Sequence, residues 1–112
     1  MESQRQLRVS RLLQKELGAL FQQESHSLYK GAMITVTKVH VTRDLGLARI
    51  FLSVFAVDNK PGVVDMINHG KKEIRYKLGS RVRHQLRSVP ELEFFEDDSL
   101  DYIENIENLL KD

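Results

Sequence analysis

The spacing of apolar residues changes from a helical period to an alternating one about a third of the way along this chain of 112 residues. Before the change, the apolar residues recur at intervals of three and four and share one broad helical face: Val9, Leu12, Leu13, Leu17, Leu20 and Phe21. Ser3 and Gln6 have the spacing of a capping box, which predicts where this helix begins. We expect it to end near Gln23, before the polar residues 24–27.

Two strands are predicted after the change of period. Residues 34–41 (Ile-Thr-Val-Thr-Lys-Val-His-Val) are rich in β-branched side chains, and residues 48–55 alternate between the two faces of a strand. One face of the second strand is apolar and carries Ala48, Ile50, Leu52 and Val54. Between the strands, Thr42-Arg43-Asp44-Leu45-Gly46 supplies turn chemistry. The pair therefore predicts an antiparallel hairpin.

The second half of the chain predicts an interrupted helix followed by a third strand. Residues 58–62 break the hairpin strand and favour a helix just beyond, which Gly70 then interrupts. The pattern resumes every fourth residue until Pro90 stops it: Ile74, Leu78, Val82 and Leu86. A short strand at 91–96 follows, and a final acidic amphipathic helix is predicted from Leu100, Ile103, Ile106 and Leu110. The order α-β-β-α-α-β plus a C-terminal helix predicts one α+β domain over residues 1–112, with a three-stranded sheet and its helices on one face.

The charge is strongly segregated, although the net charge is only +1. Residues 60–90 hold eight Lys and Arg against two Asp and Glu, whereas residues 91–112 hold nine acidic residues against one Lys. A basic body with an acidic end indicates an anionic partner, while a self-balancing charged surface is the alternative. Gly70-Lys71-Lys72 favours an anion contact at a helix start, and an ordinary kink with surface lysines is again the alternative. Tyr76 could stack on a base, although a Tyr in such a helix more often packs at the core edge.

Enzymatic chemistry finds little support in this sequence. The histidines are scattered at positions 26, 40, 69 and 84, and no pair has the spacing of metal ligands on a helix. No nucleophile elbow and no glycine-rich phosphate loop is present. We therefore expect no catalytic residue, no metal and no cofactor. The chain has no cysteine and no apolar run long enough for a membrane helix, so we expect a cytoplasmic protein.

The element order resembles a KH-type domain of the type II arrangement, and the sequence is similar to the ribosome-binding factor A family. The most specific stretch is residues 89–99, Val-Pro-Glu-Leu-Glu-Phe-Phe-Glu-Asp-Asp-Ser. Further matches are Arg8-Val9, residues 34–39, Arg43-Asp44-Leu45 with Ala48, and Ile74-Arg75 with Leu78. The resemblance covers residues 5–110.

The resemblance implies a ribosome assembly factor without enzymatic activity. Such a protein binds the free 30S subunit and its 16S rRNA late in maturation, assists RNA folding and processing, and supports growth in the cold. It implies a monomer and no membrane partner. The family's Ala-x-Gly kink would fall on Asn68, His69 and Gly70, with Asn in place of Ala. The basic residues expected to hold RNA phosphates are Arg5, Arg8, Arg11, Lys38, Arg43, Lys71, Lys72, Arg75, Arg81, Arg83 and Arg87.

A different class of function is also open at the level of sequence. A basic surface could dock an acidic protein, which would make the chain an interaction adaptor. A small hydrolase is disfavoured, because no nucleophile, base and orienting group are visible together.

Overall fold

Three strands form one mixed sheet in the order β1-β2-β3. β1 (Met33–Val41) pairs antiparallel with β2 (Leu47–Phe55), and β2 pairs parallel with β3 (Glu91–Glu96). The predicted strands are confirmed to within one residue at each end. This computed structural model describes residues 2–29 and 31–97, apart from the side chains of residues 25–28.

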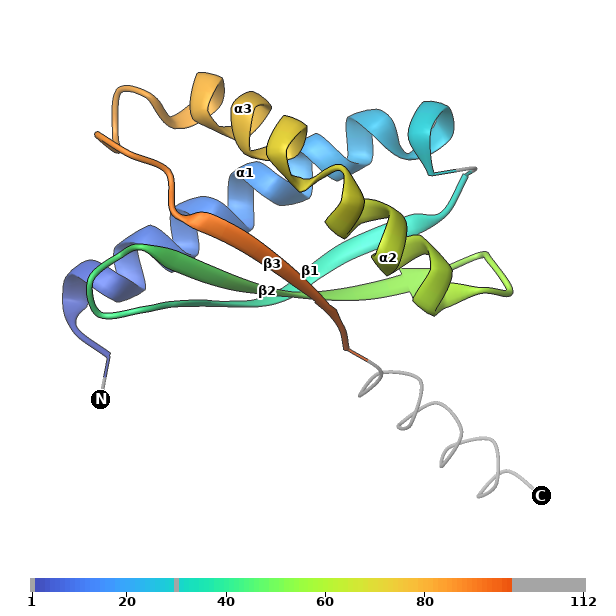
Figure 1. Ribbon diagram of the computed structural model, residues 1–112, viewed down its shortest axis with the longest axis horizontal. Coiled ribbons are helices and arrows are strands. Elements are labelled where there is room, and N and C mark those ends of the chain that lie inside the picture. Colours follow the sequence, from blue (N-terminus) through green and yellow to red (C-terminus); the bar gives the residue numbers. More distant parts are fainter. Residues whose placement is uncertain (1, 30, 98–112) are drawn as a thin grey trace, which may run out of the picture.

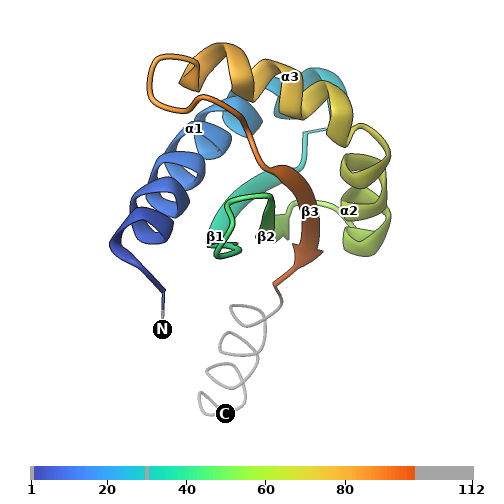
Figure 2. The same cartoon turned by 60° about the vertical axis from the view of Figure 1, so that its left-hand side comes forward.

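Three helices cover one face of this sheet, as Figures 1 and 2 show. α1 (Gln4–Leu28) lies across β1, and α2 (Lys60–His69) and α3 (Lys71–Val82) carry the chain from β2 back to the start of β3. The α+β fold of type II KH arrangement is therefore confirmed. The predicted C-terminal helix lies outside the described residues. No described helix is long and apolar enough to cross a membrane.

The core lies between the helices and the inner face of the sheet. Leu13, Leu17 and Phe21 of α1 are at most 1% exposed, and they meet the inner face of the sheet, where Ile50 and Leu52 of β2 are fully buried. Burying a side chain of this size contributes about 1.5–3 kcal/mol to folding. The apolar faces that the sequence predicted for the first helix and the second strand are thus the ones that pack.

The capping box at the start of α1 is confirmed. The Ser3 N–H donates to Gln6 Oε1 at 2.8 Å, and the Gln6 N–H donates to Ser3 Oγ at 3.1 Å. Gln6 Nε2 also donates to the Val41 carbonyl oxygen at 2.9 Å, and Gln6 is only 6% exposed. One amide therefore closes the helix end and fastens it to the last residue of β1.

Two predicted helix ends are wrong. α1 continues to Leu28 rather than ending near Gln23, because the polar residues 24–27 contain no glycine or proline. The first described residue with a left-handed φ is Gly31, at 80°. α3 ends at Val82, well before Pro90. The N–H groups of Gln85 and Leu86 still bond to the Val82 carbonyl oxygen at 2.9 Å, so Leu86 keeps the four-residue spacing and packs on the core without being helical.

The predicted break at residues 58–62 lies partly inside α2. Asn59 is the N-cap, and its Oδ1 accepts from the Gly62 N–H at 3.0 Å. Pro61 occupies the first turn, where its missing N–H costs nothing. Residues 58–62, which follow β2, therefore also begin α2.

Gln6→Ala is expected to destabilise the fold by about 1–3 kcal/mol, because it removes the capping acceptor and leaves the buried Val41 carbonyl without this donor. Urea unfolding measures the change. Gln4→Ala, an exposed substitution in the same turn, is the control and should stay within about 0.5 kcal/mol of wild type. Equal losses in the two variants would contradict the double role of Gln6.

Candidate nucleic-acid interface

Gly70 is the hinge point between α2 and α3. Its N–H bonds to the carbonyl oxygens of Met66 and Ile67, and its own carbonyl oxygen accepts from the N–H groups of Glu73 and Ile74, all at 3.1 Å. Its φ is −95°, and an added Cβ would be no nearer than 3.7 Å to the Met66 carbonyl oxygen. The break predicted here is present, but neither backbone strain nor lack of space demands a glycine.

Asn68, at the end of α2, forms two side-chain hydrogen bonds to the backbone of β3. Its Nδ2 donates to the Phe94 carbonyl oxygen at 2.9 Å, and its Oδ1 accepts from the Phe94 N–H at 3.0 Å. The side-chain amide thus pairs with the edge of β3 that faces away from β2. It bonds to this edge as the backbone of a neighbouring strand would. It fastens α2 to the last strand, a role that the sequence did not reveal.

Several basic side chains of α3 are held by partners within the fold. Arg75 donates to the Val89 carbonyl oxygen from Nη2 at 2.6 Å and from Nε at 3.1 Å, and to that of Pro90 at 3.2 Å. Arg81 pairs with Glu16 of α1 at 2.8 Å. Lys77 pairs with Glu24 at 2.6 Å, and the hydrogen bond to that carboxylate raises the pKa of Lys77. Arg81 is therefore mainly a link between α3 and α1, and Arg75 a clamp on the start of β3.

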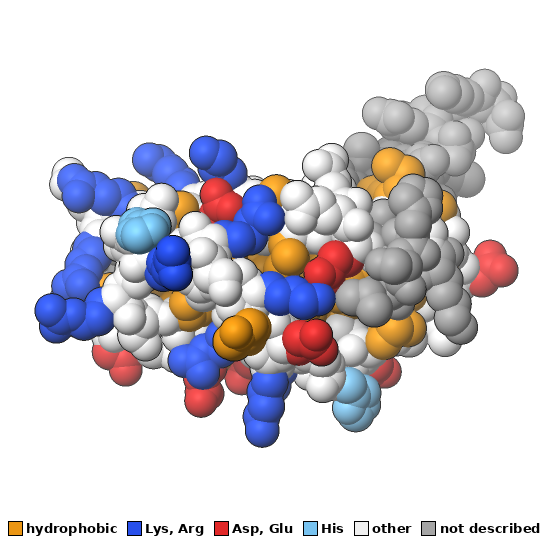
Figure 3. Space-filling model, turned by 90° about the horizontal axis from the view of Figure 1, so that it is seen from above, with side chains coloured by type: hydrophobic (Ala, Val, Ile, Leu, Met, Phe, Trp, Pro, Cys, Tyr) orange, Lys and Arg blue, Asp and Glu red, His pale blue; other side chains and the backbone are white. Residues whose placement is uncertain are grey.

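A first group of exposed basic residues lines a groove of about 310 Å³ between α1 and the loop after α3. Arg5 and Arg8 come from the first turns of α1, and Arg87 comes from the loop. Figure 3 shows basic side chains crowded at this end of the molecule. Since helix and loop are far apart in sequence, only the fold brings these three charges to one groove.

A second group lies on the outer face of α3. Lys72, Arg75 and Arg83 line a hollow of about 460 Å³. Arg83 stands one residue past the end of the helix and still continues this face. Lys71 lines a smaller neighbouring hollow, of about 210 Å³, with Lys72 and Arg75. The predicted start of an anion site at residues 70–72 thus adjoins the longer basic face.

The remaining predicted RNA-binding residues are spread more widely. Arg11 is exposed on α1, and Arg43 is exposed in the turn between β1 and β2. Lys38 lies on the sheet face away from the helices, with its Nζ 6.0 Å from the centre of the Phe51 ring. The fold therefore separates Lys38 from the two basic groups on the helical side.

The described residues contain no group of three or more His, Cys, Asp or Glu that could hold a metal ion. His40 Nε2 lies 3.3 Å from a Glu2 carboxylate oxygen, and His69 and His84 are exposed in different segments. The side chain of His26 lies outside the described part. Among the described residues, the helical side thus carries a set of cations and one exposed aromatic ring, Tyr76, which suits binding of a polyanion.

Comparison with known proteins identifies the family of the chain that carries this surface. The family model described as ribosome-binding factor A matches residues 5–110. The chain belongs to the ribosome-binding factor A family. Ribosome-binding factor A of Christiangramia forsetii is 40% identical over 98% of this chain and 85% of its own length. That of Flavobacterium psychrophilum is 44% identical over the same shares.

Solved structures of the family share the fold. The crystal structure of ribosome-binding factor A from Thermus thermophilus superposes with a TM-score of 0.66 at 21% identity, over 81% of this chain and 94% of that one. The solution structure of a putative ribosome-binding factor A from Thermotoga maritima gives 0.67 at 23% identity, over 88% and 92%. At this identity the likeness establishes the three-dimensional arrangement alone.

The sequence did not point to the uncharged residues that shape this surface. Asn68 was noted only for its place at the kink, and Gly79 and Val89, which line the hollow on α3, were not noted as part of a site. A glycine in the middle of a helical pattern was the signal available for Gly79. Nothing in the local sequence points to the partner of Asn68, because Phe94 is 26 residues away.

Asn68→Ala is expected to cost about 1–3 kcal/mol of stability, since the Phe94 N–H and carbonyl oxygen lose their partner at a half-buried site. Urea unfolding provides the measurement. His69→Ala, one residue along and exposed, should be nearly neutral. A stable Asn68→Ala variant would show that the amide does not fasten α2 to β3.

Tyr29, next to the end of α1, gives the fold a dependence on alkaline pH. Burial raises the pKa of Tyr29 to about 12, and the carboxylates of Glu24 and Glu73 add to the rise. The folded protein therefore holds this proton more tightly than the unfolded chain, where the pKa is near 10.0. The stability that the neutral phenol contributes is complete below that value and is lost as the pH rises toward 12.

Between pH ~9 and pH ~11, wild type should lose roughly 1 kcal/mol that the Tyr29→Phe variant keeps, because phenylalanine has no proton to release. Urea unfolding of both proteins at the two pH values tests this. Parallel losses would show that other groups govern the alkaline limit.

Proposed function

We propose that this protein is a ribosome assembly factor that binds the free 30S subunit late in maturation. It contacts 16S rRNA, assists the folding and processing of that RNA, and supports growth in the cold. It acts in the cytoplasm as a monomer, without a cofactor and without catalysing a reaction.

The family match over residues 5–110 carries this proposal. A further support is a relative, ribosome-binding factor A of T. thermophilus, of which a homology model has been fitted into an electron microscopy map of a 30S complex. That chain superposes with a TM-score of 0.62 at 23% identity, over 78% of this chain and 89% of its own. The shared fold means that a comparable set of helices is available to meet the same kind of particle.

The two basic groups on the helical side support contact with RNA phosphates. Arg5, Arg8 and Arg87 meet in one groove, and Lys72 and Arg83 stand on the outer face of α3. None of these five side chains forms an ion pair with a residue that the structure describes. Charges that the fold does not neutralise remain available to displace counterions from RNA.

Fractionation of a cell lysate on a sucrose gradient tests the role in the cell. We expect the protein to sediment with free 30S subunits, and its loss to leave unprocessed 16S rRNA ends, most visibly in the cold. A protein absent from the 30S fractions, together with normal rRNA ends in its absence, would refute the assembly role.

Removing two charges from the groove tests the mode of contact. Arg8→Gln with Arg87→Gln should weaken binding to purified 30S subunits and reduce the slope of log affinity against log salt by roughly 1.5–2. The matched control is Arg49→Gln with Lys60→Gln, which removes two charges that lie outside this groove. Equal effects from both pairs would show that net charge, and not the groove, governs binding.

A further inference from the structure

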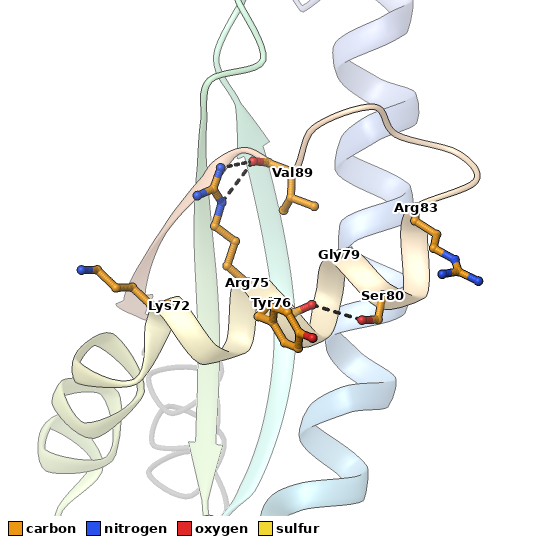
Figure 4. Close-up of a pocket in the computed structure, with 7 residues that line it drawn as sticks. All are labelled: Lys72, Arg75, Tyr76, Gly79, Ser80, Arg83 and Val89. Carbon is orange, nitrogen blue, oxygen red and sulfur yellow. Dashed lines mark hydrogen bonds between the residues drawn. The ribbon is translucent and has the colours of Figure 1, made fainter.

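The hollow on the outer face of α3 combines cations with an exposed aromatic ring. Its lining is Lys72, Arg75, Tyr76, Gly79, Ser80, Arg83 and Val89, and Figure 4 shows that all but Val89 come from α3 or its C-cap. No acidic residue belongs to this lining. The hollow therefore offers positive charge, one flat apolar surface and a small open space side by side.

Tyr76 is the aromatic surface in this hollow, and it is 78% exposed. No described aromatic residue packs against its ring, whereas Phe21, Phe51 and Phe95 all have ring partners. Lys72 precedes Tyr76 by one helical turn, about 6 Å along the axis, and Arg83 follows it by about 10 Å. The ring thus lies between two cations that have no ion-pair partner among the described residues.

Gly79 keeps the space beside the ring open. A glycine inside a helix is less stable than an alanine, and an alanine would fit here, since its Cβ would lie at an ordinary 3.6 Å from Val89 Cγ2. The backbone has no positive φ at this position that would require glycine. What a methyl group would change is the depth of the hollow between Tyr76 and Val89.

Val89 and Arg75 make the far wall of the hollow rigid. Arg75 grips the Val89 carbonyl oxygen with two nitrogen atoms, as the dashed lines in Figure 4 show. The loop therefore stays beside α3 and leaves the hollow open. A wall that is already in place lowers the ordering cost of binding.

We propose that this hollow holds one unpaired nucleotide of a single-stranded RNA segment. The base stacks on Tyr76 above Gly79, and the phosphates on either side meet Lys72 and Arg83. The proposal rests on the proposed function and narrows it, because it makes the RNA target single-stranded at this point.

Single-stranded RNA fits these observations better than its competitors do. A paired base keeps its flat face inside the duplex, so it cannot cover Tyr76. An acidic peptide would satisfy the cations, but its carboxylate side chains offer no flat ring to cover Tyr76. Stacking on an aromatic side chain is the way in which proteins hold unpaired bases without reading their sequence.

Opposite effects on stability and on binding test the role of Gly79. Gly79→Ala should raise the melting temperature and weaken binding of a single-stranded oligouridylate several-fold, because the methyl group favours the helix but fills the hollow. Gly18→Ala is the matched control: it lies within α1, and its added Cβ would meet nothing within 4 Å. It should raise the melting temperature and leave binding unchanged.

A tryptophan reporter locates the base. The chain contains no tryptophan, so Tyr76→Trp places a single indole in the hollow. Oligouridylate should quench its fluorescence, and a duplex RNA of equal phosphate number should not. Tyr76→Ala should lose about tenfold or more in affinity for the oligouridylate, while Tyr76→Phe keeps it within about threefold. Met33→Ala, another exposed apolar truncation, should have no effect.

The outcomes separate this proposal from the one on which it rests. If wild type binds 30S subunits but Gly79→Ala and Tyr76→Ala bind oligouridylate as wild type does, the nucleotide site is wrong and the assembly role stands. If wild type binds neither RNA nor 30S subunits, both are wrong. If poly-glutamate quenches the fluorescence of the Tyr76→Trp variant as strongly as oligouridylate does, the hollow is a protein-binding site and the nucleotide proposal is overturned.

Discussion

The parallel pairing of β3 with β2 is the constraint on which the rest of the structure depends. Two parallel neighbours cannot be joined by a tight turn, so the chain must travel back along one face of the sheet before it adds the last strand. α2 and α3, with Gly70 between them, make that return (Figure 1). α3 is the second helix of this return, and the face that it turns away from the sheet is exposed to solvent. That face carries the hollow with Tyr76.

Side chains of the returning helices hold β3 at two points. Asn68 bonds to Phe94 near the middle of the strand, and Arg75 bonds to the carbonyl oxygens that precede it. α3 is in turn tied to α1 by Lys77 and Arg81 through their carboxylate partners. The basic character of α3 therefore has two uses. Some cations assemble the domain, and those on the outer face remain available to a polyanion.

Much of this fold could be predicted from sequence, because the signals that specify it are local. Apolar periods, β-branched residues and breaker residues together placed the six described elements, and the spacing of Ser3 and Gln6 placed the start of the first helix. The C-terminal limit of α3 could not be placed, because Leu86 keeps the helical spacing while lying in a turn. Apolar periodicity reports which side chains meet the core, and a turn can satisfy it as well as a helix can.

The candidate site was predictable in composition but not in arrangement. The sequence shows that the stretch from residue 60 to 90 is basic, but it cannot show that Arg81 pairs with Glu16 or that Arg87 and Arg8 line the same groove. Those contacts depend on tertiary structure, which brings together residues that are distant in the chain. The same holds for Asn68, whose role became visible only beside the edge of β3.

The clamp between Arg75 and Val89 has a consequence for the order in which this protein is made. The β1–β2 hairpin uses contacts that are short in sequence, whereas β3 closes a loop of roughly forty residues back to β2, which costs more chain entropy. The clamp on Val89 spans only 14 residues, so it does not depend on closure of that loop. Val89 is nevertheless the last residue in chain order that lines the hollow on α3. A nascent chain therefore completes the lining of this hollow only after Val89 has left the ribosome that synthesises it.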